Sequence, residues 1–169
     1  MTSRFLVPAA LLLVGTIASV GVASQSAGHK PNPANSVLVP APAGALPPLP
    51  DVGYEPPLPM PLVRQVYEFA ARHPEVLNYV PCYCGCERIG HTGNHSCFVK
   101  SRAANGRITE WDLHGIGCAI CLDIGRKAMT MFNAGQSVTA IRTAIEKEYG
   151  SRFQTHTPTP LPPKSLHGS

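Results

Sequence analysis

The sequence has little of what marks most enzymes and nucleic-acid-binding proteins. Charged residues make up only 14% of its 169 positions, and the net charge of +4 is dispersed, without the basic stripe of a nucleic-acid-binding surface. It contains no phosphate-binding loop, no paired-carboxylate motif, and no spacing of serine, histidine and acid that is typical of hydrolases. These absences argue against a nucleic-acid partner and restrict any catalysis to thiol or metal chemistry.

The N-terminal part of the chain lacks charge and cysteine. Residues 5–23 are almost entirely apolar, and the single arginine Arg4 precedes them. This pattern predicts a signal peptide or an N-terminal membrane anchor at residues 1–24. No cysteine follows that could carry a lipid, and the twin-arginine pair that exports folded, cofactor-loaded proteins is missing. We therefore expect an extracytoplasmic protein, periplasmic or at the cell surface, either membrane-anchored or secreted, that acquires any metal after export.

Composition divides the rest of the chain into three parts. Residues 25–60 are rich in proline and alanine and are expected to form a disordered linker. Residues 61–153 can fold, but a domain of this size is only marginally stable without disulfides or a metal. Residues 154–169 are rich in proline and polar residues and are expected to be a disordered tail.

Hydrophobic periodicity predicts an all-α fold, a small helical domain with a long Cys/His-rich loop. Apolar residues recur at helical spacing in four segments, namely residues 62–72, 74–80, 117–133 and 138–149. Ser137 is the expected N-cap of the last helix, and Gly150 its end. Residues 85–106 are rich in Gly, His, Ser and Asn and are expected to be mostly loop.

The informative feature is cysteine, since all six cysteines lie between positions 82 and 121. They form a Cys-x-Cys-x-Cys run, a single cysteine and a Cys-x-x-Cys pair, at Cys82, Cys84, Cys86, Cys97, Cys118 and Cys121. Alternate side chains of an extended segment point the same way, so the first three thiols can converge on one ion or bridge two. A disulfide between neighbours in this run would close a very small, strained ring. The spacing therefore favours a thiolate metal site.

Three histidines in the same window are further candidate ligands. His114, Cys118 and Cys121 are spaced by four and three, so they share a helix face if the helix extends back to Asp112. Otherwise His114 approaches from the preceding turn. His91 and His95 flank Gly93 and Asn94 just before Cys97. Thiolates with imidazoles favour Cu(I), then Zn(II), and the cysteine spacing matches neither ferredoxin pattern.

Two alternatives to metal binding remain open at the level of sequence. The cysteines could form a structural set of disulfides, which an extracytoplasmic location favours. Cys118 and Cys121 could instead be a redox pair that exchanges disulfides with an exported or membrane protein, with Cys118 nearer the helix start as the nucleophile.

The string Pro81-Cys82-Tyr83-Cys84-Gly85-Cys86, with the later cysteines, resembles the bacterial PCYCGC-motif family of exported proteins, many of them lipoproteins. That family is named for its motif, so the resemblance implies an exported cysteine-rich domain without implying a reaction. Residues 118–150 are also similar, more weakly, to the helical thiol reductase of bacterial cytochrome c maturation. This second resemblance implies a thiol-disulfide oxidoreductase that uses Cys118 and Cys121.

Overall fold

A computed structural model of the chain describes residues 44–164. The predicted signal peptide or anchor at residues 1–24 lies outside the described residues. Residues 25–43 of the predicted linker lie outside them as well. No helix within the described part combines the length and the hydrophobicity needed to cross a bilayer.

The first two helices are separated by a proline. Helix α1 spans Met60–Arg72 and buries one apolar face, which includes Val63, Val66 and Tyr67. Pro74 cannot donate a backbone hydrogen bond and disfavours a helical conformation at the residue before it, so α1 ends at Arg72, with His73 as its C-cap. Helix α2 spans Pro74–Leu77 and begins at this proline. The chain then leads directly into the PCYCGC segment.

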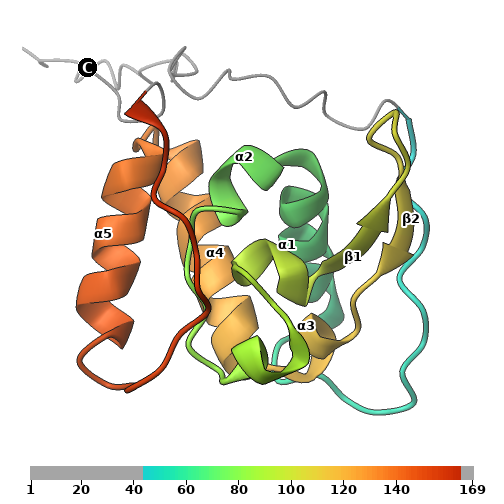
Figure 1. Cartoon of the computed structure of the whole chain (residues 1–169). Coiled ribbons are helices and arrows are strands. Elements are labelled where there is room, and N and C mark those ends of the chain that lie inside the picture. The colour runs from blue at the N-terminus through green and yellow to red at the C-terminus, as the bar shows by residue number, and fades with distance from the viewer. Residues whose placement is uncertain (1–43, 165–169) are drawn as a thin grey trace, which may run out of the picture.

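Two longer helices form the C-terminal half of the domain. Helix α4 spans Ala119–Asn133 and packs against both α1 and α5, which spans Val138–Tyr149. As predicted, the Ser137 side chain caps α5 by accepting a hydrogen bond from the Ala140 N–H at 3.2 Å. Figure 1 shows α4 between α5 on one side and α1 on the other.

The prediction of an all-α domain is wrong, because a β-hairpin begins within the segment expected to be loop and ends just beyond it. Strands β1 (Val99–Arg102) and β2 (Ile108–Trp111) pair in an antiparallel sheet. Alternation of buried and exposed residues is weak in such short strands, so the hydrophobic pattern did not reveal them. The turn between them contains Asn105-Gly106, a typical hairpin signal, and Gly106 has a φ of 80°. The fold is a small mixed domain of helices with a two-stranded sheet.

The segments that flank the predicted domain also pack against it. Pro47 in the N-terminal segment accepts a hydrogen bond from the Trp111 indole N–H at 3.2 Å. Residues 154–164, expected to be a disordered tail, cross the front of the domain in Figure 1 and return along α5. The Arg142 guanidinium of α5 binds the carbonyl oxygens of Thr159 and Pro160, and Thr157 is completely buried. The proline-rich composition therefore did not indicate that this segment packs against the domain.

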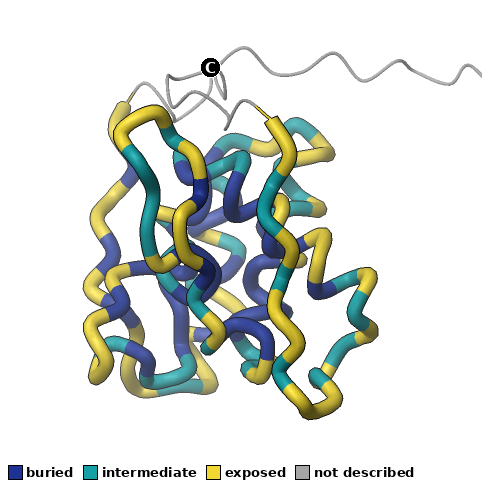
Figure 2. The backbone as a smooth tube through the Cα atoms, turned by 90° about the vertical axis from the view of Figure 1, so that its right-hand side faces the viewer, coloured by how far each residue is buried: buried dark blue, intermediate teal, exposed yellow. Residues whose placement is uncertain are grey.

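The core lies between α1, α4 and α5 and extends beneath the hairpin. Figure 2 shows the buried backbone at the centre of the domain and the exposed residues on its outer turns. Four of the six cysteines belong to this core, namely Cys82, Cys86, Cys97 and Cys121. The cysteine cluster is thus built into the centre of the fold.

Candidate metal centre

The PCYCGC segment, residues 81–86, is held from behind by the C-terminal segment. The Cys82 N–H donates to the Thr157 hydroxyl at 2.9 Å, and the Thr157 N–H donates to the Cys82 carbonyl at 2.9 Å. Tyr83 packs away from the sulfur atoms, with its ring stacked on that of Tyr149 in α5 at 5.9 Å between centroids. The alternation of the extended chain therefore places Cys82 and Cys84 on the inner side.

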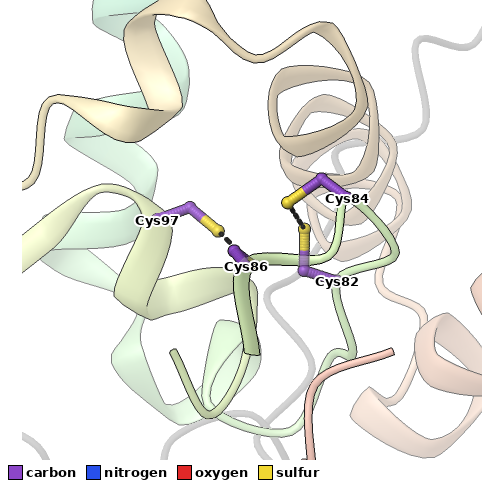
Figure 3. Close-up of side chains that lie close together, drawn as sticks. All are labelled: Cys82, Cys84, Cys86 and Cys97. Carbon is purple, nitrogen blue, oxygen red and sulfur yellow. Dashed lines mark hydrogen bonds between the residues drawn. The ribbon is translucent and has the colours of Figure 1, made fainter. Parts of the chain in front are cut away.

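Gly85 turns the chain between Cys84 and Cys86. Its φ of 81° lies in the left-handed region, where a side chain would be strained, which explains a glycine within the motif. A short 3-10 helix, η2 (Cys86–Ile89), follows this turn. The Cys86 sulfur comes to 3.7 Å from that of Cys97, which ends the 3-10 helix η3 (Asn94–Cys97). Figure 3 shows the Cys97 and Cys86 side chains joined by a dashed line beside Cys82 and Cys84.

The remaining donors come from the junction of two helices. Helix α3 spans His114–Gly117, and α4 begins after Cys118, whose extended backbone (φ −105°, ψ 104°) separates the two. His114, Cys118 and Cys121 therefore do not share one continuous helix face, and the histidine approaches from the preceding turn. The Asp112 carboxylate accepts a hydrogen bond from the His114 N–H at 2.9 Å. This contact fixes the start of α3.

The seven donors form two groups of four that share Cys84. The first, here called the four-sulfur group, consists of Cys82, Cys84, Cys86 and Cys97. The second, here called the mixed group, consists of Cys84, His114, Cys118 and Cys121. Within each group the donor atoms all lie within 4.8 Å of one another. Each group could hold a metal ion.

The distances fit metal ligands better than disulfides. The Cys84 sulfur lies 3.5 Å from that of Cys82, 3.4 Å from that of Cys121 and 3.4 Å from Nε2 of His114. Sulfurs bound to one tetrahedral zinc at about 2.3 Å would be about 3.8 Å apart. A disulfide requires about 2.05 Å, and all six cysteines are free in the structure. Small shifts would therefore bring these donors onto an ion.

The sulfur atoms also influence one another's ionisation. Hydrogen bonds from Cys118 and Cys121 hold the pKa of Cys84 well below its usual value. A hydrogen bond from Cys121 lowers the pKa of Cys82 to about 4, against the opposing effect of Cys84. The pKa of Cys121 is raised by its hydrogen bonds to Cys118, Cys82 and Cys84. Negative charge is thus concentrated on the two sulfurs of the PCYCGC segment that face Cys121, where a cation would be stabilised.

Two of the predicted histidine ligands lie outside both groups. His95 Nε2 is 3.2 Å from the Arg102 guanidinium, and burial together with that charge lowers the pKa of His95 to about 3. His91 contacts the His114 ring edge-on at 5.4 Å between centroids, and its Nε2 lies 3.4 Å from the Asp112 carboxylate. The structure therefore places His91 beside the mixed group and directs His95 toward a guanidinium.

Several residues that support the centre were not identified from the sequence. Thr157 orders Cys82 as described above, and the buried Asn94 side chain donates to the Cys121 carbonyl at 3.2 Å. The Tyr67 hydroxyl donates to the Asp112 carbonyl at 2.6 Å and so supports the residue that orients His114. Each of these contacts spans 27 or more positions of the chain. No local sequence pattern could reveal them.

Comparison with known proteins identifies one family. Residues 58–162 match the family described as "Protein of unknown function with PCYCGC motif". No curated protein and no solved structure matches the chain. The match covers well over half of the sequence, including the PCYCGC segment and every donor of the two groups. The chain therefore belongs to the PCYCGC-motif family.

Proposed function

We propose that this protein binds soft transition-metal ions outside the cytoplasm, with Cu(I) favoured and Zn(II) next, and serves in metal handling or sensing. The observation that carries the proposal is the convergence of six thiols and one imidazole from four separate segments into two contiguous groups of donors. A bound cation would let these close thiols ionise together, because it offsets the repulsion between neighbouring thiolates. The apolar residues 5–23 support the extracytoplasmic location.

The chemistry of the donors supports the choice of metal. Neither group contains a carboxylate, which is the usual ligand of magnesium and calcium. Thiolates select Cu(I) and Zn(II), and the imidazole of His114 is compatible with both. Metal binding would also supply folding free energy to a domain whose core is small.

Thiol redox chemistry is the competing explanation, and Cys118 is its expected nucleophile. Cys118 is half-buried and lies at the start of α4, where its sulfur accepts a hydrogen bond from the Cys121 N–H at 3.5 Å. A reactive thiol requires a lowered pKa. Hydrogen bonding by Cys121 lowers the pKa of Cys118. The Cys84 sulfur and burial raise it by more, so the net shift of the Cys118 pKa is upward. This direction argues against Cys118 as a redox nucleophile.

X-ray absorption spectroscopy of the full chain tests the proposal. The protein would be purified without oxygen, loaded with Cu(I) or Zn(II) in separate samples, and washed on a desalting column. We expect retained metal with a ligand shell dominated by sulfur, and a nitrogen contribution that His114→Gln removes. His73→Gln is the matched control, because His73 lies at the end of α1 outside both donor groups. Loss of all metal on desalting, or a shell of oxygen and nitrogen only, would contradict the proposal.

A further inference from the structure

The seven donors exceed what one ion can use. Zn(II) in a protein takes four ligands, and Cu(I) takes no more than four, so a single ion would leave at least three of the seven without a role. The two donor groups contain four atoms each and have only Cys84 in common. Two ions with four ligands each need eight ligand positions. Because only seven donor atoms are present in the two groups, one atom must bind both ions. The shared atom is the Cys84 sulfur.

The surroundings of Cys84 match those of a bridging ligand. Its sulfur lies 3.5 Å from Cys82 in the four-sulfur group and 3.4 Å from both Cys121 and His114 Nε2 in the mixed group. These distances approach the ligand separation of about 3.8 Å in a tetrahedral zinc site on both sides of the same atom. A thiolate has lone pairs available for two ions. We propose that the centre holds two metal ions joined by the Cys84 sulfur, an inference that rests on the proposed metal-binding function.

The two ions are held in unequal environments. In the four-sulfur group Cys82, Cys86 and Cys97 are all buried, so three of four ligands are closed to solvent. In the mixed group only Cys121 is buried, and Cys84, His114 and Cys118 are half-buried. A competing ligand can reach the mixed group without unfolding the core. The ion in that group is therefore the exchangeable one, and the ion in the four-sulfur group is structural.

Cadmium-113 NMR of the full chain, loaded anaerobically with ¹¹³Cd(II), tests the inference. We expect two resonances of equal intensity, one at the shift of four sulfurs and one at that of three sulfurs with a nitrogen, and a cadmium–cadmium coupling transmitted through Cys84. Native mass spectrometry should show two ions per chain. A chelator should remove the ion of the mixed group first.

Variants assign the ligands. His114→Gln should shift only the mixed resonance, Cys97→Ser only the four-sulfur one, and His73→Gln neither. One bound ion per chain, or two ions without coupling, would overturn the bridged pair while leaving metal binding intact. No bound ion at all would overturn both proposals. The coupling is measured in the unaltered protein, so the test does not depend on any variant folding.

Discussion

Thr157 is the residue whose loss should expose the role of the C-terminal segment. It is completely buried, and its hydroxyl accepts a hydrogen bond from the Cys82 N–H at 2.9 Å. Thr157→Val preserves the shape of the side chain and the backbone hydrogen bond from the Thr157 N–H to the Cys82 carbonyl. It removes the hydroxyl that accepts the hydrogen bond of the Cys82 N–H, and Cys82 is itself 0% exposed. The substitution thus leaves one buried donor unpaired at the centre of the metal site.

The expected cost follows from that unpaired donor. A buried backbone N–H without an acceptor costs about 1–3 kcal/mol, so the free energy of unfolding should fall by about that amount. The Thr159 hydroxyl loses its contact with Thr157 but keeps its hydrogen bond to the Thr92 carbonyl, so it should add little. Urea denaturation of the metal-loaded full chain, followed by circular dichroism, measures the change.

The neighbouring Thr155 offers a matched control. It is exposed, so Thr155→Val should change the free energy of unfolding by less than about 0.5 kcal/mol. The Thr157 variant should also lose metal to a chelator at a lower concentration than the control, because the Cys82 backbone is less well held. If the two variants were equally stable and equally resistant to the chelator, residues 154–164 would not support the site and the argument would be refuted.

Three further substitutions test other parts of the account. His95→Gln should retain the full metal content, in contrast to His114→Gln, as elemental analysis will show, because His95 faces a guanidinium. Gly115→Ala should lower the melting temperature, since a Cβ there would lie 2.5 Å from a carbonyl oxygen and from the Phe98 ring, at a cost of about 1–3 kcal/mol. Arg142→Met should release residues 154–164 to proteolysis, because two backbone carbonyls of that segment, those of Thr159 and Pro160, lose their donor. Unchanged protease resistance of that variant would show that Arg142 does not hold this segment in place.

The long helices could be predicted from sequence because their information is local. An apolar face at helical spacing and Pro74 located α1 and its end, and Ser137 located the start of α5. The hairpin was missed because each strand has only four residues, and these do not alternate regularly between buried and exposed positions. The docking of residues 154–164 depends on Arg142 and on the Cys82 backbone, both distant in sequence. Composition alone predicted disorder there.

The candidate site shows the same division between local and distant information. Cysteine spacing singled out all six thiols, and His114 was identified through its distance from Cys118. The histidines His91 and His95 looked equivalent in sequence, since both flank Gly93 and Asn94. Only the fold shows that one lies beside Asp112 and the other against Arg102. Proximity along the chain could not show which way a loop side chain would point.

The central claim is that the cysteine cluster binds metal in the native protein. The most direct measurement is elemental analysis of the full chain, purified without oxygen, paired with a count of reactive thiols before and after denaturation in the presence of a chelator. The account predicts stoichiometric copper or zinc, with the thiols becoming reactive only after chelation. Metal-free protein whose six cysteines react at once, or whose cysteines are all oxidised to disulfides, would contradict it.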